Sequence, residues 1–245
     1  GKQYYDFIAE LSEVDRQFFH HSGSGKIIGI SEPMINLYRL LSQIRKKDVT
    51  TILYGSSGTG KNLVAGCLHD YSLRKNNPFI SVNCPAIPKE LLESELFGHA
   101  KGAFTGADSD KDGKFQAANS GTIFLDEIGD MDMGLQAKIL RVLENGEVEK
   151  VGTNNSIKVD VRVVSATNQD LPKMVEEKKF RQDLYHRINV FPITVPSLSD
   201  HPGDIPFIAY SILQKLSKKH GSSVSYISSN ALSFMKSYDW PGNVR

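Results

Sequence analysis

The feature that most constrains this chain is a glycine-rich loop between an apolar run and an amphipathic segment. Residues 51–54 are strand-like, and the loop that follows is Gly55-Ser56-Ser57-Gly58-Thr59-Gly60-Lys61-Asn62. Glycines let successive backbone N–H groups converge on phosphate oxygens, and the N-terminus of a following helix favours the same anion. A lysine at the end of the loop can reach the β and γ phosphates. The pattern predicts a nucleotide-binding P-loop; an ordinary glycine-rich turn is the alternative.

Asn62 departs from the general pattern of such loops. Most of them carry a Ser or Thr hydroxyl at this position, which touches Mg²⁺. We therefore expect the metal to be held through water and by a carboxylate elsewhere in the chain.

A second apolar run, residues 122–125, ends in the adjacent carboxylates Asp126 and Glu127. Open α/β sheets bind their ligands at the carboxyl ends of the strands. Asp126 is suited to hold Mg²⁺ through water, and Glu127 to polarise the water that attacks the γ phosphate. Paired acids are also common where a helix starts, so this prediction depends on their combination with the P-loop.

Strand-like and helix-like segments alternate along the chain, which predicts an open α/β fold with a parallel sheet. We expect a linker helix over residues 1–25, an α/β subdomain over 26–196 and a small helical lid over 197–245 that is incomplete at its C-terminal end. The candidate strands are residues 50–54, 79–83, 122–125, 159–165 and 190–195.

Composition limits where the protein acts. The chain has 245 residues, of which 40% are hydrophobic, enough for one large domain or a large and a small one. No apolar run approaches the roughly 20 residues that cross a bilayer, and no secretion signal begins the chain. We expect a cytoplasmic protein with no membrane partner. A formal net charge of +1 argues against a large nucleic-acid-binding surface.

Between the second and third candidate strands lies a segment punctuated by glycines at 98, 102, 106 and 113. Such glycines predict a mobile loop rather than a strand. Phe104 is its one aromatic residue after Phe97. It could tuck inward, but the chemistry of a P-loop needs no such loop, which favours an outward contact point.

Two further pairs are candidates for the site. Thr167 and Asn168 follow the fourth candidate strand and could sense the γ phosphate, although Asn168 could instead cap a turn. Arg181 and Arg187 are close enough to one face of a predicted helix to act together. They are either solvated or complete the nucleotide site of a neighbouring subunit.

With these motifs assembled, the chain resembles the central ATPase domain of sigma-54-dependent transcriptional activators, which are bacterial enhancer-binding proteins of the AAA+ class. The resemblance runs from about residue 28 to 245. It is carried by Glu95-Leu96-Phe97-Gly98-His99 followed by Gly102-Ala103-Phe104-Thr105-Gly106-Ala107. It implies an AAA+ P-loop NTPase fold, with a five-stranded parallel sheet flanked by helices and a helical lid.

The resemblance also implies roles for single residues. Phe104 and Thr105 would contact sigma-54, and Asn83 would tether Glu127 until hydrolysis is signalled. The remaining roles concern the nucleotide: phosphate binding by Gly58, Gly60 and Lys61, metal and water by Asp126 and Glu127, the first sensor by Thr167 and Asn168, the trans arginines Arg181 and Arg187, and the second sensor Arg245.

Some positions depart from the family pattern. Ser56 and Asn62 replace residues that are usually Glu, and Ala100 replaces another Glu before the loop. The hinge Ser199-Asp200-His201-Pro202 lacks the arginines common there, which puts its nucleotide contacts in question. A regulatory domain and a helix-turn-helix are missing, so we expect an excised piece of a longer activator that meets DNA only through an absent C-terminal domain.

The resemblance therefore implies an ATP- and Mg²⁺-dependent ATPase that forms a homo-oligomeric ring, expected to be a hexamer. Hydrolysis would move the Phe104 loop against the sigma-54 RNA polymerase holoenzyme and remodel its closed complex. The alternative, suggested by Asn62 and the altered hinge, is a nucleotide-dependent assembly module with weak or no hydrolysis.

Overall fold

The computed structural model describes residues 27–245, so the predicted linker helix over 1–25 lies outside the described residues. The chain divides into two compact units. Of the described residues, the first unit contains 27–43, 55–67 and 194–245, and the second contains 44–54 and 68–193. The phosphate loop thus groups with the C-terminal helices. The predicted subdomain limits follow the chain order instead and remain a prediction.

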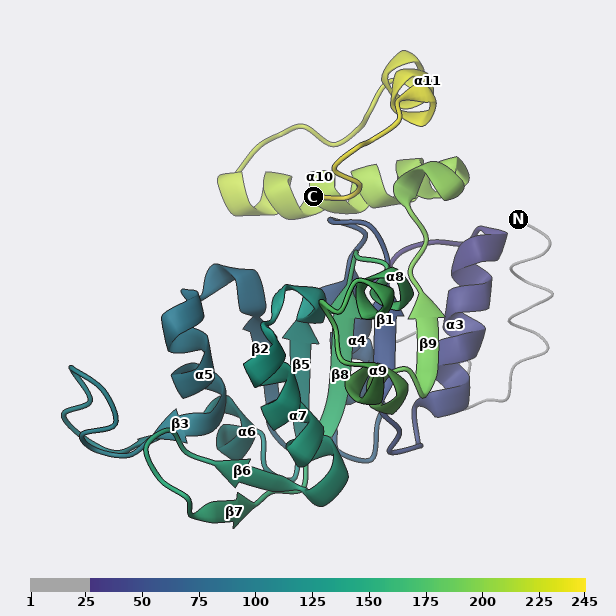
Figure 1. The fold of residues 1–245 in the computed structure, drawn as a ribbon. Coiled ribbons are helices and arrows are strands. Elements are labelled where there is room, and N and C mark those ends of the chain that lie inside the picture. Colours follow the sequence, from purple (N-terminus) through teal and green to yellow (C-terminus); the bar gives the residue numbers. More distant parts are fainter. Residues whose placement is uncertain (1–26) are drawn as a thin grey trace. The chain divides into compact units, whose positions relative to one another are not determined.

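The second unit is built on a five-stranded parallel sheet, which confirms the predicted fold class. The strand order is β2-β5-β8-β1-β9, and Figure 1 shows these strands side by side. Their bounds are β1 Thr51–Tyr54, β2 Phe79–Asn83, β5 Thr122–Asp126, β8 Arg162–Thr167 and β9 Phe191–Thr194.

The fourth candidate strand starts later than expected, at Arg162 instead of Val159. The backbone N–H groups before it bond to loops and not to the sheet. Val159 donates to the carbonyl of Gly146 at 2.8 Å, and Asp160 donates to Asn119 Oδ1 at 2.9 Å. The alternating sequence pattern therefore begins before the hydrogen-bonded strand does.

Helices of the second unit pack on the sheet through one apolar core. Ile123 and Leu125 of β5 share this core with Val163 of β8, and all three are at most 3% exposed. Alternate residues of a strand face the same side, so these helices cover one face of the sheet. The helices are α5 Lys89–Phe97, α6 Lys114–Ala117, α7 Met133–Asn145, α8 Leu171–Glu176 and α9 Gln182–Ile188.

Two short hairpins extend from this unit. The first pairs β3 Gly98–His99 with β4 Lys111–Asp112, and the second pairs β6 Glu147–Glu149 with β7 Ser156–Lys158. The glycine-punctuated segment forms the loop of this first hairpin, although Gly98 itself lies in β3. The predicted mobility of the loop stays a prediction. Short 3₁₀ turns complete the connections at Cys84–Ala86 and Ile128–Asp130 of this unit, and at Leu198–Asp200 and Pro202–Asp204 of the first unit.

The first unit combines the phosphate loop with helices from both ends of the chain. These are α3 Glu32–Ile44, α10 Ile205–His220 and α11 Ser229–Ser237, while α4 Lys61–Asp70 begins at the end of the loop. Gly221 ends α10 in a left-handed conformation, and Ser228 Oγ caps α11 by accepting from the N–H of Ala231. No helix within residues 27–245 is long and apolar enough to span a membrane.

Candidate functional site

The phosphate loop continues directly from the last residue of β1 and ends where α4 begins. Gly58 and Gly60 have φ of +83° and +95°, a region that favours glycine. Lys61 is 6% exposed, and its ammonium donates to the carbonyl of Gly55 at 2.8 Å and of Ser56 at 3.4 Å. The lysine is therefore held over the loop by the loop's own backbone. Asn62 is exposed on the first turn of α4.

Within the first unit, residues 242–245 lie directly against this loop. Arg245 Nη2 donates to Ser57 Oγ at 2.9 Å, and the N–H of Val244 donates to the Gly58 carbonyl at 3.1 Å. Asn243 is buried and makes two bonds: its Nδ2 donates to the Ser57 carbonyl, and its Oδ1 accepts from the N–H of Leu198. The predicted second-sensor arginine is thus in contact with a predicted phosphate-loop residue.

The side chain of Asn243 links two distant segments of the first unit. Both of its polar ends bond to segments more than 40 residues away in the chain. Local spacing reveals capping partners three residues on, but it contains no information on such distant ones.

Gly58→Ala is expected to destabilise the first unit. A Cβ there would lie 2.1 Å from the Gly242 carbonyl oxygen, and a left-handed φ costs an L-residue about 1–2 kcal/mol. The midpoint of thermal unfolding should therefore fall by at least about 2–4 °C. Gly66→Ala in α4 is the matched control, because nothing lies within 4 Å of its new Cβ and alanine favours the helix. Equal midpoints for the two variants would contradict the packing argument.

In the second unit, the predicted acidic pair lies at the carboxyl end of β5. Asp126 is the last residue of the strand, and its Cα is in register with Asn83 of β2. Glu127 follows in a left-handed conformation, with φ 55° and ψ 55°, which is uncommon for a residue other than glycine. Such conformations persist only where the surrounding structure holds them, and they cluster at functional sites.

Glu127 is fixed by the predicted first sensor. Its Oε2 accepts a hydrogen bond from the N–H of Asn168 at 2.9 Å. Asn168 therefore contributes its backbone at this point. The tether between Asn83 and Glu127 stays a prediction. The nearby thiol of Cys84 is raised in pKa to about 12 by burial and by the charges of Asp126 and other carboxylates, so it is protonated at neutral pH.

The predicted sensor Thr167 is linked at this edge of the sheet to Gln169 and Asp130, which the sequence analysis missed. Thr167 is fully buried at the end of β8, and its Oγ1 accepts from the N–H of Gln169 at 3.0 Å. Gln169 Nε2 in turn donates to Asp130 Oδ1 at 2.6 Å. Asp126, Glu127, Thr167 and Asn168 are thus gathered at one edge of the sheet, the same edge at which β1 ends.

The acidic edge has the chemistry that Mg²⁺ requires. Within the described part of the chain, no group of three or more His, Cys, Asp or Glu side chains could hold a metal ion. A dedicated metal cage is not needed, because Mg²⁺ in nucleotide sites keeps several waters and uses one or two carboxylates with the phosphates. The carboxylate of Asp126, half-buried at the strand end, fits that donor set.

The two predicted trans arginines occupy separate positions. Arg181 precedes α9 with extended backbone and pairs with Asp183 through Nε at 3.0 Å and Nη2 at 2.7 Å. Arg187, in the last turn of α9, donates to the Leu143 carbonyl at the end of α7. The expectation that both lie on one helix face is wrong, because the helix begins after Arg181.

Gln136 positions the first of these arginines and was also missed. It is fully buried on α7, where its Nε2 donates to the carbonyls of Met131 and Lys179. Its Oε1 accepts from the N–H of Arg181 at 2.8 Å. The available signal was a polar residue beside Leu135, Ile139 and Leu140, apolar residues that recur at helical spacing.

The predicted contact loop is a compact turn. The N–H of Gly102 donates to the Ala107 carbonyl, and that of Ala107 donates to the Phe104 carbonyl. Gly102 and Gly106 have φ of +81° and +96°. The Phe104 ring is 38% exposed and packs edge-on against the buried His99 ring, with centroids 5.0 Å apart. Phe104 is therefore both presented at the surface and supported from beneath.

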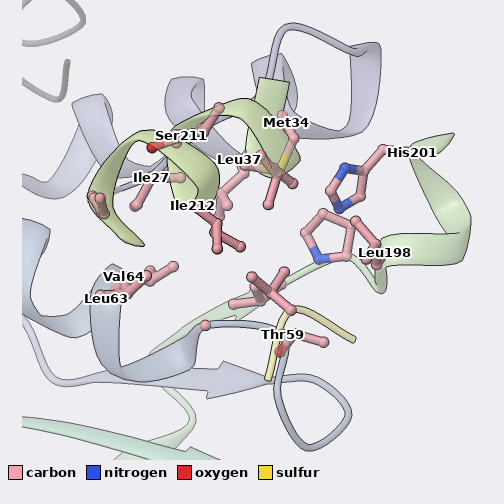
Figure 2. A pocket seen from close by; sticks show the side chains of 17 residues that line it. Ile27, Met34, Leu37, Thr59, Leu63, Val64, Leu198, His201, Ser211 and Ile212 are labelled. Atoms are coloured by element: carbon pink, nitrogen blue, oxygen red, sulfur yellow. The ribbon is translucent and has the colours of Figure 1, made fainter. Parts of the chain in front are cut away.

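The first unit also contains an apolar pocket beside the phosphate loop (Figure 2). Its cavity volume is about 180 Å³, and aliphatic side chains make most of its wall. A cavity of about 150 Å³ with such a wall can hold a benzene ring, so a flat heteroaromatic base is of suitable size. Lining residues include Leu37 of α3, Thr59 and Val64 of the loop and α4, and Leu198, His201 and Ile212 of the C-terminal segment.

Comparison with known proteins agrees with this geometry. The sigma-54 interaction domain family matches residues 27–194, and the AAA+ ATPase lid domain matches residues 199–245. The chain is 46% identical over 236 residues to the DNA-binding transcriptional activator HyfR of Escherichia coli (strain K12), covering 96% of this chain and 35% of that protein. It is 48% identical over 219 residues to the DNA-binding transcriptional regulator NtrC of Rhizobium meliloti (strain 1021), covering 89% and 45%.

The chain is also similar to solved structures. NtrX from Brucella abortus in complex with ATP has a TM-score of 0.83 and 36% identity, covering 89% of this chain and 47% of that one. Its complex with ADP has a TM-score of 0.84 and 34% identity, covering 93% and 50%. The chain spans less than half the length of the two curated relatives above. Because the family match covers well over half of its residues and the lid match follows directly, the chain belongs to the sigma-54 interaction domain family and ends in an AAA+ lid domain.

Proposed function

We propose that this chain is an Mg²⁺-dependent ATPase whose hydrolysis remodels the closed complex of the sigma-54 RNA polymerase holoenzyme. The observation that carries the proposal is the shared sheet edge, where β1 leads into the phosphate loop and β5 leads into Asp126 and Glu127. Similarity to an ATP complex of NtrX supports nucleotide binding.

In this proposal the loop residues bind the phosphates, and Lys61 leaves its carbonyl partners to meet the β and γ phosphates. Asn62, Arg245 and the remaining loop residues complete the nucleotide contacts. Asp126 would hold Mg²⁺ through water, and the bound metal would neutralise part of the phosphate charge. Glu127 accepts the proton of the attacking water. The Asn168 N–H keeps the Glu127 carboxylate in a fixed direction.

The proposal places the completed site between subunits of a ring, which by family resemblance is a hexamer. Arg181 and Arg187 would supply charge from a neighbouring copy to the phosphoryl transition state. In the single chain the Arg181 guanidinium pairs with Asp183 through two hydrogen bonds, and its side chain is 36% exposed. The protein would act in the cytoplasm and reach DNA through a helix-turn-helix domain outside these residues.

The test of hydrolysis is the ATPase rate per subunit as a function of protein concentration. A site completed in trans turns over faster as rings form, so the specific activity should rise with concentration. A non-hydrolysing assembly module would release no phosphate at any concentration, and a self-sufficient protomer would show a constant specific activity.

The loop Gly102-Ala103-Phe104-Thr105-Gly106-Ala107 is proposed to contact sigma-54. Phe104→Ala should keep the ATPase rate while lowering affinity for sigma-54 by roughly 30-fold or more, as expected for a buried aromatic anchor at an interface. The measurements are phosphate release and the binding of purified sigma-54 in the presence of a transition-state analogue of ATP.

Leu73→Ala is the matched control for the loop variant, because Leu73 is an apolar side chain of the same unit that is 75% exposed. It should leave both measurements unchanged. Full sigma-54 binding by Phe104→Ala would remove the loop from the interface.

A further inference from the structure

The apolar pocket of the first unit has a buried imidazole in its wall. His201 is 5% exposed and belongs to the hinge that lacks the arginines expected from the family pattern. Figure 2 shows His201 and Leu198 on one side of the pocket and Leu63 and Val64 on the other. Apolar side chains can hold a flat base, but they cannot distinguish one purine from another. A directional polar group in such a wall can do so.

The carboxylate behind His201 determines which nitrogen carries a proton. His201 Nδ1 lies 3.2 Å from Asp204 Oδ2, and Asp204 is fully buried. Asp204 also accepts from the N–H of Ile30 at 2.8 Å and from Ser31 Oγ at 2.5 Å. Burial alone would raise the pKa of Asp204, but the nearby His201 ring and the donors of Ile30 and Ser31 outweigh it and hold this pKa below its usual value.

An ionised carboxylate can only accept hydrogen bonds. The negative charge of Asp204, 3.2 Å from Nδ1, favours the proton on that nitrogen, and in the neutral ring Nε2 is then the acceptor. Adenine and guanine differ at position 6 of the purine ring, where adenine has an amine that donates and guanine has a carbonyl that accepts. An acceptor in the pocket would favour the amine.

We propose that His201 is the residue that selects the base, with Nε2 accepting a hydrogen bond from the exocyclic amine of adenine. The inference rests on the proposed nucleotide binding and adds its specificity. Asp204 is a positioning residue in this account, since it acts on the base only through the imidazole. Its bonds to Ile30 and Ser31 fix the carboxylate that orients the ring.

The test compares three triphosphates on the full chain: ATP, GTP and purine riboside triphosphate, which has neither an amine nor a carbonyl at position 6. Affinities are measured by competition with a fluorescent ATP analogue. The wild-type chain should bind purine riboside triphosphate roughly tenfold to hundredfold more weakly than ATP, as expected for one buried hydrogen bond lost. GTP should bind at least as weakly as purine riboside triphosphate.

Substitutions then assign the contact. His201→Phe keeps a flat apolar ring and should bring the ratio of ATP to purine riboside triphosphate affinity close to one. His201→Gln retains an acceptor and should restore part of the ratio. Ser211 supplies another hydroxyl in the pocket wall, and Ser211→Ala should leave the ratio as in the wild type. Thermal unfolding of each variant checks that it is folded. The comparison of the three triphosphates on the wild-type chain does not depend on any variant.

The outcomes separate this inference from the proposed function. Equal wild-type affinities for the three triphosphates would overturn base selection while leaving nucleotide binding intact. Tighter binding of GTP than of ATP would mean that Nε2 donates, and would overturn the assigned tautomer. A ratio lost in Ser211→Ala but kept in His201→Phe would assign the contact to Ser211. Binding of none of the three would overturn both proposals.

Discussion

Glu127→Gln is expected to lower the ATP hydrolysis rate by about 10²- to 10⁴-fold, the usual contribution of a general base, while ATP stays bound. The amide is nearly isosteric with the carboxylate, and its oxygen can still accept from the N–H of Asn168, which is 2.9 Å from Oε2 in the wild type. The substitution therefore removes the proton acceptor and keeps the local geometry. Phosphate release and ATP affinity, measured on the same preparation, separate the two effects.

The left-handed backbone at this residue strengthens the prediction. Glu127 keeps φ at 55°, a conformation that costs free energy in any residue other than glycine and persists only where the surroundings hold it. Glu177→Gln is the matched control, since Glu177 is an exposed carboxylate of the same unit that pairs with Lys179. It should hydrolyse ATP at the wild-type rate. Unchanged phosphate release in Glu127→Gln would mean that another group activates the water.

Arg181→Ala is expected to reduce hydrolysis by about 10³- to 10⁵-fold with little change in ATP affinity, the effect of an arginine supplied in trans. The guanidinium is paired with Asp183 in the single chain, and the buried Gln136 holds the backbone of Arg181, so the side chain starts from a defined backbone position. Arg141→Ala is the control, because Arg141 is an exposed arginine of the same unit paired with Glu149. It should retain the wild-type rate.

Mixing two inactive variants tests the position of Arg181 directly. In a ring that mixes Arg181→Ala with Glu127→Gln subunits, some interfaces combine an intact Glu127 from one copy with an intact Arg181 from the next. Partial recovery of hydrolysis on mixing is therefore expected for a trans arginine. Absence of recovery, with ATP affinity lost in Arg181→Ala alone, would assign this residue to its own subunit or to folding.

The local features of the chain were predictable because their signals are local. The phosphate loop, the five strands and the ends of α7 and α10 at glycines follow from spacing within a few residues. The acidic pair at the end of β5 was found for the same reason, since an apolar run that stops at two carboxylates marks a strand end at a ligand edge. The start of β8 was misplaced because alternation alone does not say where ladder bonds begin.

Contacts between distant segments could not be predicted in this way. Asp204 is bonded to Ser31 across 173 residues, and Asn243 is bonded to Ser57 across 186. Gln136 holds the backbone of Arg181 across 45 residues. The sequence next to each of these residues does not identify its partner. Such a hydrogen bond depends on which two segments of the chain lie side by side in the fold, and not on the periodicity of either segment.

By itself, then, the sequence determined the elements of the fold, the phosphate loop and the identity of the charged groups, since glycine conformations, apolar periodicity and side-chain chemistry act over a turn or two of chain. The tertiary structure alone decided which groups meet: Asn168 with Glu127, Arg245 with Ser57, and His201 with Asp204. These pairings arise when packing of the apolar core brings remote polar groups together, and burial then requires each of them to find a partner.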